Sequence, residues 1–190
     1  MKKYFYLFIA AMLATFSLGL TSCSNDDDDD NGGSGSGKTT LKVGNNNYTF
    51  NNIYWNIDDE SSTSTQNYYQ LEFATFNIYG NKYPSKFSMF YVGFRAPGST
   101  NELPTGSFSD FDLSGSVDVS SSNGEGTYIE GYNQNSGNLV ISKEGNQYTI
   151  SIEPLYILSG EDETNLTTTV TSLNYTGSIP KAPRKSWDGD

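Results

Sequence analysis

The sequence predicts an all-β protein, an antiparallel β-sandwich of about eight or nine strands. Residues that favour strands are abundant, with 14 tyrosines and 11 phenylalanines beside many Thr, Val and Ile. Several stretches alternate apolar and polar residues with period two, and none sustains the 3.6-residue period of a helix. Short turns rich in Gly and Asn join these stretches, which favours antiparallel hairpins over parallel crossovers.

The first predicted strands are Leu41–Val43 and Tyr48–Ile57, which flank a Gly-Asn-Asn-Asn turn. The next is the stretch 66–79, QNYYQLEFATFNIY. Within it, one parity carries Tyr69, Leu71 and Phe73, and the other carries Phe76 and Ile78. This change of parity predicts a bulge or a switch of faces near Ala74 and Thr75.

The stretch 86–94, KFSMFYVGF, has apolar residues on both parities, so we expect a central strand there. Leu139–Lys143 and Gln147–Ile152 form the clearest hairpin, since Glu144-Gly145-Asn146 separates two alternating runs. The remaining predicted strands are Ser114–Ser121, Thr127–Tyr132 and Leu166–Ser178.

Two long predicted loops, Asp58–Thr65 and Arg95–Asp112, favour two packed sheets over a closed barrel. The strand lengths suit the alternative, a closed barrel like that of the calycins and lipocalins. Both architectures remain open from the sequence.

The N-terminus has the layout of a secretory signal peptide. Lys2 and Lys3 precede the apolar stretch Phe5–Leu20, and Leu-Thr-Ser-Cys follows at 20–23. Those four residues resemble the lipobox of bacterial lipoproteins. The resemblance implies removal of residues 1–22 and attachment of lipid to Cys23, which would anchor the protein to a membrane.

Residues 23–37 are predicted to be a flexible tether, because five aspartates and the run NGGSGSG contain nothing to bury. An acidic run directly after the lipidated cysteine resembles the surface-export signal of Bacteroidetes-type lipoproteins. It implies an outer-membrane lipoprotein that faces the cell exterior, with the periplasmic face as the alternative. We expect the β-domain at 38–180 and a C-terminal tail at 181–190.

Composition excludes several classes of function. The formal charge is −11, so we expect no nucleic-acid partner. The chain has no histidine and one cysteine, which removes imidazole-based catalysis, thiolate zinc clusters and internal disulfides. We therefore expect a protein that is not an enzyme, with no catalytic residue, no cofactor and no resident metal.

A second resemblance lies in the C-terminal half. The segments LPTGSF (103–108), SGNLVISKEGNQYTISIE (136–153) and LNYTGS (173–178) are similar to those of small Bacteroidetes lipoproteins of lipocalin-like or unknown-function type. This resemblance implies a fold type and a habitat, and it implies no catalytic residue.

Aromatic residues beside amides are the best candidates for ligand binding. Trp55, Tyr68 and Tyr132 each stand near Asn or Gln, and sugars stack on aromatic rings while their hydroxyls bind polar groups. The alternative for each is packing in the core. Asp110 and Asp112 have a spacing that could offer oxygens to Ca²⁺, although a solvated turn explains it better.

Three functions follow as hypotheses. The first is a non-catalytic surface lipoprotein that binds an extracellular ligand, such as a glycan. The second is a lipocalin-like carrier of an apolar small molecule. The third is an accessory subunit that contacts an outer-membrane protein.

Overall fold

The predicted all-β class is confirmed. The structure is a computed structural model that describes residues 37–80, 84–98, 101–132, 136–161 and 165–183, and these residues form strands and no helix. In that part of the chain, no helix long and apolar enough to cross a membrane is found. The predicted signal peptide and nearly all of the tether, with Cys23, lie outside the described residues.

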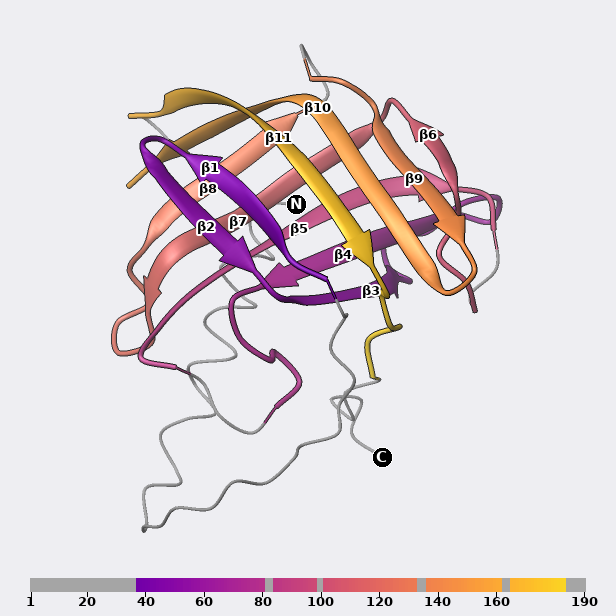
Figure 1. The fold of residues 1–190 in the computed structure, drawn as a ribbon, viewed down its shortest axis with the longest axis horizontal. Helices are drawn as coiled ribbons and strands as arrows, with labels where there is room; N and C mark the ends of the chain where they lie inside the picture. The colour runs from indigo at the N-terminus through magenta and orange to yellow at the C-terminus, as the bar shows by residue number, and fades with distance from the viewer. Residues whose placement is uncertain (1–36, 81–83, 99–100, 133–135, 162–164, 184–190) are drawn as a thin grey trace, which may run out of the picture.

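Nine strands form one antiparallel sheet, and the first two form a separate hairpin (Figure 1). The order in the large sheet is β3-β4-β5-β7-β8-β10-β9-β6, and β11 pairs with β10. The strands are β1 (Thr39–Val43), β2 (Asn46–Phe50), β3 (Asn52–Asp58), β4 (Asn67–Ala74), β5 (Lys86–Ala96), β6 (Gly106–Phe108), β7 (Phe111–Ser120), β8 (Thr127–Tyr132), β9 (Leu139–Glu144), β10 (Gln147–Gly160) and β11 (Thr167–Gly177).

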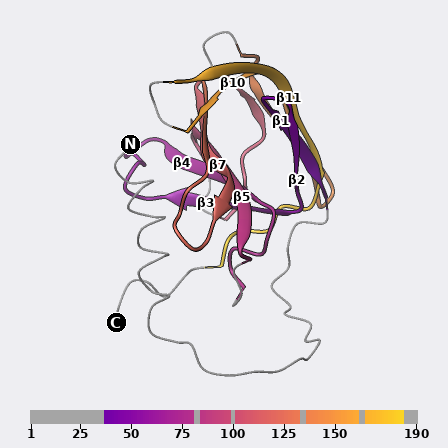
Figure 2. The ribbon, with the colours of Figure 1, turned by 90° about the vertical axis from the view of Figure 1, so that its left-hand side faces the viewer.

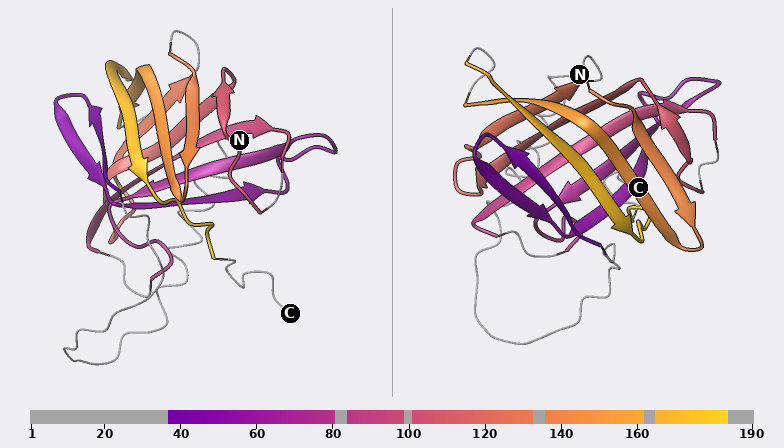
Figure 3. Two further views of the ribbon diagram at one scale, coloured as in Figure 1. Left: turned by 45° about the vertical axis from the view of Figure 1, so that its right-hand side comes forward. Right: turned by 45° about the horizontal axis from the view of Figure 1, so that its top comes forward.

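The large sheet bends so that its strands lie in two packed layers. Figures 1 and 2 show β1, β2, β10 and β11 on one side and β3, β4, β5 and β7 on the other, and Figure 3 shows the two sets crossing. The long strand β10 joins the layers, because Gln147–Ser151 pairs with β9 whereas Ile157–Gly160 pairs with β8. Pro154 lies between these halves, at a register shift, where a missing N–H is tolerated.

The sheet is not closed, so the calycin-like barrel is not formed. Strand β3 ends the large sheet, and its outer edge is met by the segment that follows β11. Trp55 N–H donates to the carbonyl of Pro180, and Ala182 N–H donates to the carbonyl of Trp55. The start of the predicted C-terminal tail thereby covers an edge that would otherwise expose unpaired backbone groups.

The main core lies between the layers and is rich in aromatic rings. Phe73 stacks on Phe90 at a centroid distance of 4.5 Å, and Phe50 meets Phe90 edge-on at 4.8 Å. Phe94 contacts Phe108 at 4.5 Å. The rings therefore pack against one another in the space where the carrier hypothesis places an open lumen.

Both predictions about the two faces of the sheet are confirmed. Tyr69, Leu71 and Phe73 enter the main core, whereas Phe76 and Ile78 enter a second, smaller cluster on the opposite face. Strand β5 lies centrally between β4 and β7 and supplies both clusters.

The prediction of one strand over Tyr48–Ile57 is wrong at one residue. The chain turns a corner at Asn51, which separates β2 from β3. The physical reason is a change of parity, because Phe50 points into the core as an even-numbered residue, whereas Ile53 and Trp55 do so as odd-numbered ones. Three further differences are β4, which ends at Ala74 rather than at Tyr79, β6, which lies within the predicted loop Arg95–Asp112, and β10, which continues beyond Ile152.

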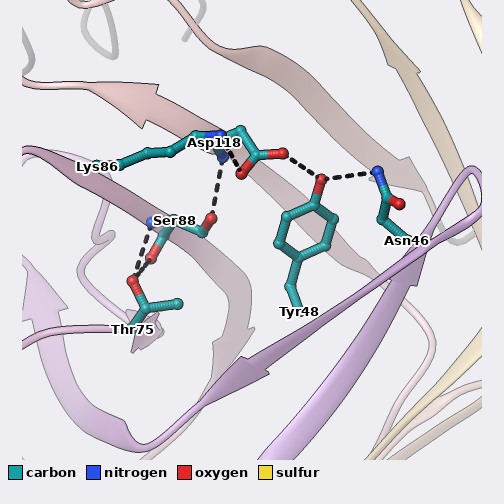
Figure 4. Close-up of polar contacts among 6 residues, drawn as sticks. All are labelled: Asn46, Tyr48, Thr75, Lys86, Ser88 and Asp118. Atoms are coloured by element: carbon teal, nitrogen blue, oxygen red, sulfur yellow. Dashed lines mark hydrogen bonds and ion pairs between the residues drawn. The ribbon is translucent and has the colours of Figure 1, made fainter.

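A β-bulge re-aims Asp118 in β7. Between the pairs Phe87–Val119 and Met89–Ser116, two residues of β7 oppose Ser88 alone. Asp118 has φ 57°, a left-handed conformation that Asp adopts more readily than most residues. Its N–H donates to Ser88 Oγ at 3.0 Å (Figure 4).

Candidate functional site

Strand register gathers polar and aromatic residues on the outer face of one layer, the face opposite the main core. Across β3, β4, β5, β7 and β8 one row aligns Asn56, Gln70, Gly93, Asp112 and Tyr132. The flanking rows are Asp58, Tyr68 and Arg95 on one side and Tyr54, Glu72, Tyr91, Ser114 and Glu130 on the other. Because side chains alternate between faces, all of these positions belong to the same face.

Tyr68 and Asp112, both singled out from the sequence, are in direct contact. The Tyr68 hydroxyl donates to Asp112 Oδ1 at 2.7 Å, across the intervening strand β5. The Arg95 guanidinium lies 5.1 Å from the centroid of the Tyr68 ring, within cation–π range. The three side chains form one hydrogen-bonded and stacked unit.

Gly93 makes this contact possible. A Cβ on Gly93 would lie 1.9 Å from the Tyr68 hydroxyl oxygen and 3.1 Å from Asp112 Oδ1. The tyrosine therefore lies directly over bare backbone and reaches from β4 to β7. This is a position where the close approach itself requires glycine.

Burial sets the protonation of the pair. Burial, then the hydrogen bond to Asp112, raises the pKa of the Tyr68 hydroxyl above its ordinary value, so the hydroxyl stays a donor. Burial also raises the pKa of Asp112, and the charges of Asp110 and Glu130 act in the same direction. The hydrogen bond from Tyr68 and the charge of Arg95 oppose that rise.

The part of this face around Asp112 is half-exposed and polar. We define the outer patch as Gln70, Arg95, Asp112, Ser114 and Glu130, all of them partly exposed. Amide and guanidinium groups supply donors there, and carboxylates and the hydroxyl supply acceptors. The backbone of Tyr132, the third aromatic candidate, occupies the register position beside Asp112 on β8, and its side chain lies outside the described part of the structure. The patch presents both kinds of hydrogen-bonding group on a rigid sheet.

Neither Trp55 nor Tyr68 forms an exposed aromatic platform. Trp55 is 3% exposed and packs in the main core, because its parity points inward with Ile53. Its ring also lies 5.2 Å from Lys181 Nζ. Tyr68 faces outward but is 6% exposed, since it lies between Gly93 and Arg95.

Among the described residues, no third acidic side chain joins Asp110 and Asp112 to form a metal site. Asp110 is exposed, whereas Asp112 is half-buried and bound to Tyr68. Over the described ranges, no group of three or more acidic or sulfur-bearing side chains is placed to hold a metal ion.

A second polar cluster surrounds Glu72, which is 5% exposed. Asn56 Nδ2 donates to Glu72 Oε1, and the Tyr79 hydroxyl donates to Oε2, each at 2.5 Å. Burial and the charge of Glu72 raise the pKa of Tyr79. Asn56 Oδ1 is buried there, and no described residue forms a hydrogen bond to it. This carboxylate lies beside the second apolar cluster and serves the packing of that region.

Sequence reasoning missed Arg95 and Glu130, and it treated Gln70 only as the amide beside Tyr68. The signal for Gln70 was its parity, because it alternates with Tyr69 and Leu71, whose side chains enter the main core. Strand order was needed to bring β4, β5, β7 and β8 side by side, and no local pattern specifies it.

The comparisons with known proteins add no relative. No protein-family model, no curated protein and no solved structure matches this chain.

Proposed function

We propose that this protein is a non-catalytic, membrane-anchored lipoprotein that binds an extracellular glycan at the outer patch. The observation that carries the proposal is the alignment of Gln70 and Asp112 in one row across neighbouring strands, with Arg95 and Glu130 in the flanking rows. A hydroxyl-rich ligand needs donors and acceptors at fixed positions, and a sheet holds them with little freedom.

The unit of Tyr68, Asp112 and Arg95 gives the patch a fixed centre. Tyr68 holds one oxygen of Asp112, and Arg95 is held against the Tyr68 ring. Asp112 and Arg95 therefore lose little side-chain entropy on binding, which favours affinity for a flexible sugar chain.

Attachment to the membrane completes the proposal. Lipid on Cys23, followed by the acidic tether, would hold many copies of the domain on one surface. Weak sites on such copies act together on a repetitive polymer, because each further contact is made at high effective concentration. A polysaccharide is a ligand that benefits from this arrangement.

Binding is tested with the purified full-length protein in detergent on a glycan array, followed by affinity electrophoresis. We expect retention on at least one neutral polysaccharide, and about a tenfold loss in Gln70→Ala and Glu130→Ala, since each removes a hydrogen-bonding group worth roughly 1–2 kcal/mol. Thr149→Ala and Thr176→Ala are matched controls, because both residues are exposed on the other layer. No retention, or equal loss in the controls, contradicts glycan binding.

Two further measurements test the remaining parts of the proposal. Mass spectrometry of the N-terminal peptide should find acyl chains on Cys23, and a bare thiol there contradicts anchoring. Protease treatment of intact cells should cleave the protein if it faces the exterior. Release of shortened sugars during the binding assay would show hydrolysis and contradict a non-catalytic role.

A further inference from the structure

We propose that the β1–β2 hairpin is an exchangeable plug, and that two copies of this chain form a dimer by swapping it. Each hairpin would occupy, in the other copy, the position that it occupies in its own. The proposal depends on described residues only and is independent of glycan binding.

The backbone pairing of the hairpin is separate from that of the large sheet. Its two strands form their own sheet, joined to each other by five register pairs from Thr39–Phe50 to Val43–Asn46. It lies beside β11 without joining the backbone ladder of the large sheet (Figure 1). A hairpin that pairs only with itself can leave without breaking a ladder elsewhere.

Side chains make the polar contacts that replace a backbone ladder along β11. Thr39 Oγ1 donates to the carbonyl of Asn174 at 2.7 Å, and Gly44 N–H donates to Thr169 Oγ1 at 2.8 Å. Both threonine side chains are buried. These contacts specify where the hairpin lies, and an identical hairpin from a second copy satisfies them equally.

A third contact acts as a latch on the other side of the hairpin (Figure 4). The Tyr48 hydroxyl donates to Asp118 Oδ2 at 2.6 Å, and Lys86 Nζ lies 3.0 Å from Oδ1. The bulge that re-aims Asp118 makes this reach possible. Thr75 Oγ1 accepts from the N–H of Ser88, whose own hydroxyl accepts from Asp118 N–H, so the latch is tied to the sheet.

The hairpin also fills part of the main core. Leu41 and Phe50 have no exposed surface and Val43 is 5% exposed. An open hairpin would expose these residues and the core beneath them, so an open monomer is strongly disfavoured. The occupant of that core must present the same apolar and polar pattern, and a second copy of the hairpin is such an occupant.

The connection to β3 has the form of a swapping hinge. Asn51 alone separates β2 from β3, is exposed, and its N–H donates to the carbonyl of Ala74 at 3.3 Å. If Asn51 became extended, β2 and β3 would run on as one strand and carry the hairpin away from its own core. Short hinges favour such exchange, because a closed corner is harder to form than an extended chain.

The closed monomer and the exchanged dimer therefore share every contact except those at the hinge. Hinge length therefore sets the equilibrium between monomer and dimer, and the rate at which the hairpin opens sets the rate of exchange. A dimer of closed monomers joined at their surfaces would not depend on Asn51.

The test measures the mass of the full-length protein in detergent by light scattering, over a range of concentrations after mild warming. We expect a dimer that reverts slowly on dilution. Deletion of Asn51 should raise the dimer fraction about tenfold, and insertion of Gly-Gly after Asn51 should lower it about tenfold, as hinge strain requires. Gly-Gly inserted at Gly145, an open turn, is the control and should match the parent.

Two measurements keep the proposal falsifiable if the deletion fails to fold. Tyr48→Phe should speed interconversion several-fold without changing the equilibrium, because both states contain the latch. Amide exchange should show Leu41 and Val43 equally protected in monomer and dimer. A protein that stays monomeric, a dimer that ignores hinge length, or a dimer whose hairpin amides lose protection would overturn the proposal.

Discussion

The hydroxyl of Tyr68 and the carboxylate of Asp112 lie 2.7 Å apart, although 44 residues separate them in the chain. Strand β5 lies between their strands, and the Tyr68 side chain crosses β5 over Gly93, which has no side chain to block it. The contact joins three neighbouring strands through one side chain. It also places a buried donor against a carboxylate whose own burial opposes its charge.

Tyr68→Phe tests the energy of that hydrogen bond. The ring and its contact with Arg95 remain, while Asp112 loses a buried donor. We expect a loss of about 1.5–3 kcal/mol in the free energy of unfolding, as for a hydrogen bond to a charged group. Urea denaturation measures it, with Tyr156→Phe on β10 as a control for removal of a hydroxyl from a half-buried tyrosine. An equal loss in both variants contradicts a special role for Tyr68.

Asp112→Asn tests the cost of the buried charge. Burial raises the pKa of Asp112 in the folded protein above its ordinary value of about 4. The protonated carboxyl therefore contributes fully to the free energy of unfolding below that ordinary value, and this contribution is lost as the pH rises through the folded-state pKa. The amide still accepts from Tyr68 without a charge. We expect the variant to be more stable than the parent at pH 7 and equal to it near pH 3. If the stability advantage of Asp112→Asn over the parent grew as the pH fell, the pKa of Asp112 would be shifted in the opposite direction.

Asp118→Asn should behave in the opposite way. The hydrogen bond from Tyr48, with Lys86 nearby, lowers the pKa of Asp118, so its contribution is present above about pH 4 and is lost as the pH falls through the folded pKa. The carboxylate is 41% exposed, so we expect a loss of only about 0.5 kcal/mol at pH 7.

Asparagine also tolerates the left-handed backbone at position 118, so Asp118→Asn removes the charge without straining the backbone. Asp118→Ala removes both and should be destabilised by about 1 kcal/mol more than the asparagine variant. Thermal unfolding at pH 7 and pH 3 measures the set. Equal stabilities for Asn and Ala would show that the bulge tolerates any residue.

Local patterns predicted the strands well because alternation reports directly which face is buried. The alternation around Leu71 and Phe90 predicted both strands, the faces that are buried and the switch of faces after Phe73. The corner at Asn51 was also encoded, since the apolar parity changes between Phe50 and Ile53. The prediction of one continuous strand missed that change.

The site was less predictable because it depends on strand order. Tyr68, Asp112 and Tyr132 were each identified, yet no sequence pattern states that β4, β5, β7 and β8 are neighbours. Trp55 shows the converse, because adjacent polar residues suggested exposure while its own parity placed it in the core. A polar neighbour in a strand faces the other side of the sheet and says little about the residue beside it.

Gly93→Ala tests whether the glycine exists to admit Tyr68. The new Cβ would overlap the Tyr68 hydroxyl, which cannot move without leaving Asp112. We expect a loss of about 2–3 kcal/mol from overpacking. In a Tyr68→Ala background the same substitution meets no ring, so it should be nearly neutral, and the double-mutant cycle should give a coupling energy close to the whole loss. Gly131→Ala on β8 is the matched control, because its nearest atom, Leu113 Cβ, is 3.2 Å away and Tyr68 is not among its neighbours. A Gly93→Ala loss that persists without the Tyr68 ring would locate the constraint in the backbone of β5 and remove the tyrosine from the explanation.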